Sequence, residues 1–212
     1  MTKKEIFVQT LIDKVKQQNE MGVIGGKFYT VDILSDGDLL KKNLSTYHAI
    51  VAGVRAYNTR DILKSVQARL LDYVSKGGRL VVQYNTSFGL KSKSIGPFPF
   101  KISRDRVTEE DAKMTLLEPD HSFFLVPNKI EQSDFDGWVQ ERGLYFANQW
   151  DNAYTALLSC NDRGETAKKG SLLVAKHGKG VFVFTGLSFF RQIPAGVPGA
   201  LKLFVNLLES GV

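Results

Sequence analysis

The sequence predicts an α/β domain in which a mostly parallel sheet is covered by helices on both faces, a three-layer αβα sandwich. Three observations support this fold class. A buried strand pattern at 48–54, an amphipathic helical pattern and a second buried strand pattern at 79–84 follow one another with short connections. Such a unit implies parallel strands with the helix packed across them. A strong hairpin signal and a final amphipathic helix complete the pattern.

The first 34 residues predict a helix followed by a strand. Phe7, Leu11 and Val15 recur at helical spacing, and glycines from Gly22 onward end that pattern. The alternation of apolar and polar residues at 28–34 then predicts a strand.

The next segment carries the predicted strand–helix–strand unit. Small and apolar residues at 48–54 are typical of a strand covered on both faces. Asn58 or Thr59 is expected to cap the following helix, which Gly77 and its neighbour Gly78 end. The buried stripe of that helix is expected to consist of Ile62, Val66, Leu70, Leu71 and Val74.

The middle of the chain, about 86–150, shows little periodicity and contains four prolines. An irregular stretch of this length inside a compact domain is usually functional or an insertion. We therefore expect residues 1–212 to form one domain with an irregular insertion at about 86–150.

Regular structure is expected again after this stretch. The residues at 154–159 predict a strand, and those at 171–175 and 181–185 predict two strands joined by the turn His-Gly-Lys-Gly at 177–180. A terminal helix is expected at 198–208.

Composition limits the class of protein. The chain of 212 residues has 43% hydrophobic and 24% charged residues, as globular proteins do, and it contains no apolar run of membrane-spanning length. The net charge is +6. The basic residues are interspersed with acidic ones and are densest between Lys91 and Arg106, so we expect a solvated surface and no nucleic-acid partner.

Lone Cys160 is expected to be a buried structural thiol. The compartment stays open: cytoplasmic as written, periplasmic or secreted if the chain is a fragment of a longer exported protein.

Candidate ligand-binding residues follow the predicted strands. In open parallel sheets ligands bind beyond the carboxyl ends of the strands, where here the loops 55–60, 85–89 and 186–192 are expected to meet. Guanidinium groups there suit a carboxylate, a phosphate or a polyhydroxylated ligand. The alternative is that the arginines bind strand-end carbonyls or aspartates. The candidates are Arg55, Tyr57, Asn58, Tyr84, Asn85, Ser188 and Arg191.

A second cluster lies in the irregular middle, where Trp138, Arg142 and Tyr145 are close in sequence. Aromatic and bidentate groups together favour a sugar-stacking or partner surface. The same residues are equally suited to packing the insertion onto the sheet, and both alternatives stay open.

Motifs for common catalysis and cofactors are absent from the sequence. No nucleophile elbow occurs, no two histidines have metal-ligand spacing, and neither a phosphate-binding P-loop nor a dinucleotide fingerprint is present. We therefore predict no catalytic residue, no metal and no cofactor. Asp120 and His121 form either an acid–base pair or, more simply, a turn.

Four runs of the sequence resemble a known family. They are Ala-Gly-Val-Arg-Ala-Tyr-Asn-Thr-Arg at 52–60, Gly-Gly-Arg-Leu-Val-Val-Gln-Tyr-Asn at 77–85, Asp-Gly-Trp-Val-Gln-Glu-Arg-Gly at 136–143 and Thr-Gly-Leu-Ser-Phe-Phe-Arg-Gln at 185–192. In this order they resemble the domain at the C-terminus of some bacterial PIG-L/LmbE-type sugar N-deacetylases, a ThuA-like member of the class I glutamine amidotransferase-like superfamily. The resemblance implies a flavodoxin-like sheet, a carbohydrate context and a deacetylase domain or other protein as partner.

The chain departs from the amidotransferases at their catalytic positions. Gln83, Tyr84 and Asn85 stand where those enzymes have a cysteine after a strand, and Ser188 to Arg191 stand where they have histidine and glutamate. This favours a non-catalytic accessory or ligand-binding module for a sugar or an anionic small molecule. Two alternatives stay open: a hydrolase acting on a carbohydrate or amide through Tyr84 or Asp120–His121, and a protein-docking domain that uses Trp138 and Tyr145.

Overall fold

The computed structural model describes residues 31–92 and 94–210. The helix predicted around Phe7 to Val15 and the first residues of the strand predicted at 28–34 lie outside this part. The strand prediction is wrong for residues 31–34, which have no regular secondary structure. Val31 and Ile33 are exposed there, Ile33 by 68%, and residues 31–34 pair with no strand of the described sheets.

The described chain contains short and long helices and many short strands. The helices are α2 (Asp36–Lys41), α3 (Ala56–Thr59), α4 (Ile62–Ser75), α5 (Ser122–Leu125), α6 (Phe189–Gln192) and α7 (Pro198–Glu209), with 3₁₀ turns η1 (Leu44–Thr46) and η2 (Gln132–Phe135). The strands are β1 (Ala49–Ala52), β2 (Arg79–Val82), β3 (Phe100–Ile102), β4 (Arg106–Val107), β5 (Thr115–Leu116), β6 (Gly143–Leu144), β7 (Ala147–Trp150), β8 (Thr155–Ala156), β9 (Leu158–Ser159), β10 (Leu172–His177) and β11 (Gly180–Thr185).

The main sheet has five strands in the order β1-β2-β11-β10-β8. The pairings β1–β2 and β2–β11 are parallel, with Arg79 opposite both Ala49 and Val181. The pairings β11–β10 and β10–β8 are antiparallel. The predicted α/β class and the C-terminal hairpin are confirmed, and the sheet is of mixed orientation.

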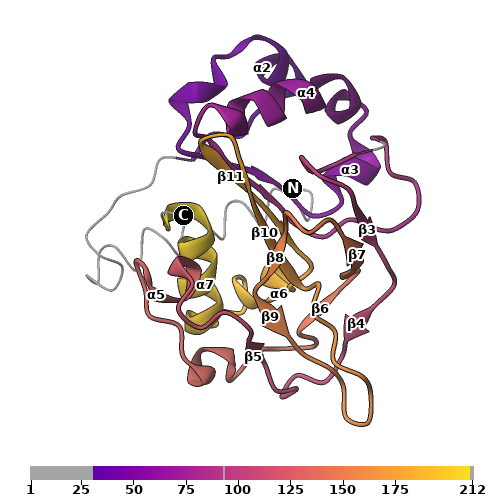
Figure 1. Ribbon diagram of the computed structural model, residues 1–212, viewed down its shortest axis with the longest axis vertical. Helices are drawn as coiled ribbons and strands as arrows, with labels where there is room; N and C mark the ends of the chain where they lie inside the picture. The colour runs from indigo at the N-terminus through magenta and orange to yellow at the C-terminus, as the bar shows by residue number, and fades with distance from the viewer. Residues whose placement is uncertain (1–30, 93, 211–212) are drawn as a thin grey trace.

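Helices cover both faces of this sheet. Leu80 and Val82 belong to the same buried cluster as the apolar side of α4, whereas Val81 and Val183 belong to the cluster that contains α7. Successive side chains of a strand point to opposite faces, so α4 and α7 lie on opposite sides. Figure 1 shows this arrangement, with α2 and α4 above the sheet and α5 and α7 at its other face.

The helix α4 begins later than its predicted caps. Asn58 and Thr59 lie in the separate short helix α3, and Asp61 is the residue before α4. The Asn58 side chain is used elsewhere, since its oxygen accepts from the Thr86 N–H at 2.9 Å and its amide donates to the Phe88 carbonyl at 3.0 Å. The predicted glycine stop is confirmed, because Gly77 has a φ of +114° just after α4.

The strand predicted at 154–159 is divided into two. Its first part, β8, pairs with β10 in the main sheet, whereas β9 pairs with β5 from the middle segment. The middle segment also contributes to the small sheets β3–β7 and β4–β6. It is therefore folded around its own short pairings, which carry no periodic signal. Within residues 31–92 and 94–210, no helix has the length and apolarity needed to cross a membrane.

Candidate functional site

The candidate site lies where the parallel strands β1, β2 and β11 end. Because these strands run in the same direction, the segments that follow them meet at one edge of the sheet. A backbone bond joins two of these segments, since the Arg55 N–H donates to the Tyr84 carbonyl at 2.8 Å. The backbones of the loops after β1 and β2 therefore meet, as expected from the sequence, and the candidate side chains divide into two groups.

The first group of candidates lies inside the protein. Tyr57 is fully buried, its hydroxyl donates to Gln67 Oε1 at 2.7 Å, and burial raises its pKa. Its backbone N–H donates to Asn85 Oδ1 at 2.9 Å, and the Asn85 amide donates to the Gln83 carbonyl. Tyr57 and Asn85 therefore hold the loops together rather than present their side chains to a ligand.

Ser188 and Asn58 have the same structural role. The Ser188 hydroxyl is buried and donates to the Glu141 carbonyl, while the Gln192 side chain donates to Ser188 Oγ at 2.9 Å. Asn58 ties α3 to the loop after β2 through the bonds described above. Both side chains bond to backbone groups of neighbouring segments and hold these segments together.

The second group surrounds the Tyr84 ring. This ring stacks on the Tyr145 ring, with a centroid distance of 5.9 Å and an interplanar angle of 13°. Its centroid lies 5.2 Å from that of the Phe190 ring. Burial raises the pKa of the Tyr84 phenol, and the positive charges of Arg55 and Arg191 oppose that rise. Both guanidinium groups therefore lie close enough to act on the phenol.

Glu141 joins two arginines from different segments. It is 2% exposed, and its carboxylate accepts from Arg106 Nη2 at 2.7 Å and from Arg191 Nε at 2.9 Å. Both carboxylate oxygens are thus engaged, whereas Arg106 and Arg191 keep part of their surface in solvent. The ion pairs fix the direction in which each guanidinium points.

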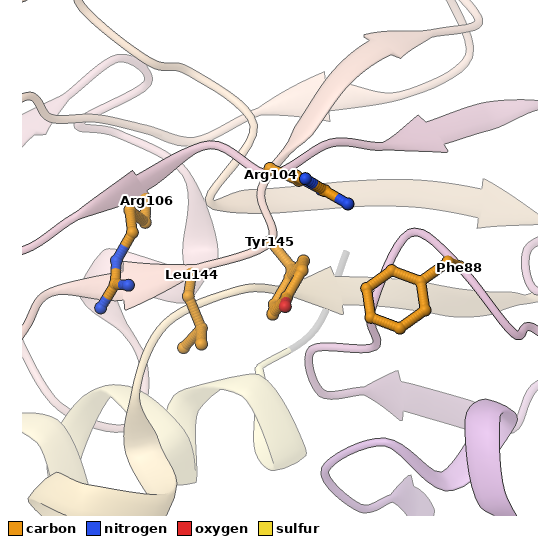
Figure 2. Close-up of a pocket in the computed structure, with 5 residues that line it drawn as sticks. All are labelled: Phe88, Arg104, Arg106, Leu144 and Tyr145. Carbon is orange, nitrogen blue, oxygen red and sulfur yellow. The ribbon is translucent and has the colours of Figure 1, made fainter.

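A cavity of about 380 Å³ opens beside the Tyr145 ring. Figure 2 shows Tyr145 and Phe88 next to each other, with Arg104 above them and with Arg106 and Leu144 farther along. The Arg104 guanidinium lies 6.0 Å from the centroid of the Phe88 ring. We call the whole group the arginine–aromatic site. It consists of Arg55, Tyr84, Phe88, Arg104, Arg106, Glu141, Leu144, Tyr145, Phe190 and Arg191.

Backbone strain is concentrated at this site. In the described chain, the non-glycine residues with positive φ are Arg55 (56°), Gln140 (68°) and Tyr145 (55°). Two of them belong to the site, and the third accepts a hydrogen bond from Arg191 through its side chain. Left-handed conformations are costly for bulky residues and are retained where the surrounding structure requires them, often at functional sites.

The charge of the site is positive. Four arginines from three segments of the sequence, around positions 55, 104–106 and 191, accompany the carboxylate of Glu141. Guanidinium groups bind planar and tetrahedral anions through paired hydrogen bonds.

Over residues 31–92 and 94–210, no cluster of three or more histidine, cysteine or acidic residues could hold a metal ion.

Trp138 and Arg142 lie in the core, so they do not form the predicted partner surface in this structure. Each is 2% exposed, and the Trp138 indole donates to the Asp134 carbonyl at 3.0 Å. Arg142 donates to the carbonyls of Ala112, at 2.9 Å, and Phe135, and it lies over the Trp138 ring. The packing alternative describes both residues, whereas Tyr145 belongs to the arginine–aromatic site. Trp138 and Arg142 also line a second cavity of about 430 Å³.

Other residues considered from the sequence have structural positions. His121 begins α5, where its Nδ1 accepts from the Phe123 N–H at 3.2 Å, as expected for the turn alternative. Cys160 is buried, as predicted, and burial raises its pKa to about 12. Gln83 directly follows β2. It is fully buried, and neither side-chain polar atom has a hydrogen-bond partner in the described structure.

Comparison with known proteins gives the fold alone. No family model and no curated protein match the chain. Among solved structures, the cytoplasmic protein STM1381 from Salmonella typhimurium LT2 superimposes with a TM-score of 0.57 at 14% identity, over 94% of this chain and 85% of that one. The cytoplasmic protein STM3548 from Salmonella typhimurium gives a TM-score of 0.52 at 14% identity, over 94% and 84%.

A third similar structure is a β-galactosidase from Bacillus circulans sp. alkalophilus, with a TM-score of 0.57 at 14% identity. The match covers 96% of this chain and 26% of the galactosidase, so the chain spans about a quarter of that enzyme. The same fold thus occurs both in proteins of similar length and within a much longer chain.

Proposed function

We propose that the chain is a non-catalytic binding module whose arginine–aromatic site holds a small anionic ligand. The observation that carries this proposal is the buried carboxylate of Glu141, already paired with Arg106 and Arg191, next to a cavity of about 380 Å³ that Arg104 and Arg106 line. A ligand that supplies further negative charge would complete this arrangement.

The environment of the nucleophilic groups supports a non-catalytic role. The Ser188 hydroxyl is buried and bonded to a backbone carbonyl, and burial keeps the Cys160 thiol protonated. Burial also favours the neutral phenol of Tyr84. Nucleophilic catalysis requires a group activated by a neighbouring base or by a lowered pKa, and none of these three has such activation.

The finer fold assignment belongs to the same proposal. We infer a three-layer, flavodoxin-like sandwich of the class I glutamine amidotransferase-like, ThuA-like type. The parallel β1-β2-β11 unit with α4 and α7 on opposite faces supports it. The carbohydrate context and the PIG-L-type deacetylase partner rest on the sequence resemblance alone, and a sugar acid or sugar phosphate would agree with both that resemblance and the arginines.

Calorimetric titration of the purified chain tests the binding proposal. Glucose 6-phosphate and glucuronate are expected to bind, whereas neutral glucose is not, because only the anions satisfy the guanidinium groups. Arg104→Gln is expected to weaken anion binding. Lys179→Gln, which removes one charge at the opposite end of β11, is the matched control and should bind as the unmodified chain does.

Arg55→Gly separates binding from folding. The substitution removes a guanidinium near Tyr84 and also relieves a φ of +56° that glycine adopts freely. We expect weaker anion binding together with an unchanged or higher melting temperature. Equal affinity for glucose and its phosphate, or unchanged affinity in both arginine variants, would contradict the proposal.

A further inference from the structure

We propose that the ligand of the arginine–aromatic site is a phosphate ester that also carries a flat aromatic ring system, as a nucleoside monophosphate does. This inference rests on the proposed anion site and adds a chemical class for its ligand. It comes from the cavity beside Tyr145, whose lining side chains are Phe88, Arg104, Arg106, Leu144 and Tyr145.

The lining offers donors and apolar surface but few acceptors. Arginine side chains only donate hydrogen bonds, so among the five lining side chains only the Tyr145 hydroxyl can accept one. The neighbouring carboxylate of Glu141 is 2% exposed and both of its oxygens are bonded to arginines. The lining side chains therefore offer few partners to the hydroxyl donors of a sugar, and many to the acceptor oxygens of a phosphate. A ligand of acceptors and flat apolar surface fits the lining better.

The aromatic side of the cavity is held in place before any ligand binds. Tyr84 lies almost parallel to the Tyr145 ring and is itself packed against Phe190. The Tyr145 backbone has a φ of +55°. Such a strained conformation is retained only where the surrounding structure holds it, and the packing of these rings contributes to that. A ring that stacks on Tyr145 would extend an existing stack, with little conformational entropy to lose.

Phe88 provides the second aromatic surface. It lies on the loop after β2 and is 57% exposed, so more than half of an apolar ring faces water. Figure 2 shows it beside Tyr145 at the cavity. A flat ligand would bury this surface, which favours binding through the hydrophobic effect.

The arginines favour phosphate as the anionic group. Arg104 and Arg106 both line the cavity, and Arg104 also lies over the Phe88 ring. A guanidinium can stack on a ring and bind an anion at the same time. A phosphate dianion offers more acceptors and more charge to two such groups than a single carboxylate does. Because the chain has no P-loop, this recognition would rest on side chains and would weaken as salt concentration rises.

Calorimetry with three related probes tests the inference on the full chain. AMP contains the ring and the phosphate, ribose 5-phosphate lacks the ring, and adenosine lacks the phosphate. We expect AMP to bind at least about fivefold more tightly than ribose 5-phosphate, the smaller end of the range for stacking a base on an aromatic side chain, and more tightly than adenosine, which lacks the phosphate. Phe88→Ala should remove most of this advantage and leave ribose 5-phosphate binding unchanged. Leu125→Ala removes an exposed apolar side chain of α5 and is the control.

The outcomes distinguish the two proposals. If ribose 5-phosphate binds as tightly as AMP, or if Phe88→Ala changes neither, the ring inference is overturned and the anion site stands. If adenosine binds as tightly as AMP, or if no phosphate binds, the anion site itself is overturned. Because Phe88 is mostly exposed, loss of the fold in Phe88→Ala is not expected, and an unchanged melting temperature checks this.

Discussion

The main sheet and the middle segment of this molecule are stabilised in different ways. In β2 and β11 every residue is buried, and most of them are apolar. In the middle segment, buried polar side chains support the fold: Asp134 accepts from the Glu131 N–H, Glu141 pairs with arginines and Arg142 donates to backbone carbonyls. The arginine–aromatic site lies where these regions meet. Tyr84 and Arg191 follow strands of the main sheet, whereas Arg106, Glu141 and Tyr145 belong to the middle segment.

The largest effect is expected from a core substitution in the sheet. Phe184 is fully buried in β11 and its ring lies 4.9 Å from that of Phe100. Phe184→Ala should lower the free energy of unfolding by about 3–5 kcal/mol, because the lost ring leaves a cavity in a packed core. Urea unfolding measures this, and a loss below about 1 kcal/mol would show that the sheet core is not packed as described.

A polar core substitution in the middle segment is expected to be nearly as severe. Arg142→Met keeps much of the side-chain volume but leaves the buried carbonyls of Ala112 and Phe135 without their donors. We expect a loss of about 3 kcal/mol, since each unsatisfied buried acceptor costs about 1–3 kcal/mol. The exposed Arg163 provides the control, and Arg163→Met should change stability by no more than about 0.5 kcal/mol. Equal small effects in both variants would contradict the role given to buried polar groups.

Gln83, directly after β2, is a buried polar side chain without such bonds, and its replacement is expected to raise the free energy of unfolding. Its buried amide has no hydrogen-bond partner in the described structure, so the isosteric change Gln83→Met should raise the free energy of unfolding by about 1–2 kcal/mol. Urea unfolding of the variant is the measurement. A decrease in stability instead would mean that the amide is bonded in solution, and the contrast between the two regions would then be smaller.

The smallest effect concerns pH and the middle segment. Burial lowers the pKa of His121 from 6.5, and its Nδ1 accepts a hydrogen bond only while unprotonated. The unfolded chain therefore binds a proton first as pH falls. The stability contributed by this group is complete above the unfolded pKa of about 6.5 and is lost as pH falls from there through the lower folded pKa.

Unfolding experiments between pH 7.5 and about 5.5 measure this dependence. In His121→Asn, the asparagine can still begin α5 but does not titrate in this range, so the corresponding slope should be absent. An identical slope in the variant and the unmodified chain would assign the pH dependence to other groups.

The regular part of the fold was accessible from the sequence for physical reasons. The helix α4, the hairpin β10–β11 and the helix α7 carry clear periodicity or turn chemistry, such as the φ of +60° at Gly178 in the hairpin turn. The middle segment is different, because strands of two residues such as β4 and β6 are set by long-range pairing and leave no periodic pattern. The strand predicted at 28–34 is wrong over its described residues 31–34, because alternation alone does not supply a partner strand.

The site was only partly predictable for the same reason. Arg55, Tyr84, Tyr145 and Arg191 were identified because each stands near a strand end or in an aromatic cluster. Glu141 pairs with Arg106 across 35 positions and with Arg191 across 50, and a single sequence shows neither pair. The only available signal for Arg104 and Arg106 was their place in the most basic stretch of the chain. Tyr57 and Asn85 were selected for their polar groups, which the fold uses internally.

The measurement that tests the central claim most directly is the mapping of amide and indole NMR shifts during titration with AMP. The anion-binding account predicts changes at Phe88, Arg104 and Tyr145, and an unchanged signal from the buried Trp138 indole beside the second cavity. Changes centred on Trp138 and Arg142, with the residues around Tyr145 unaffected, would contradict it.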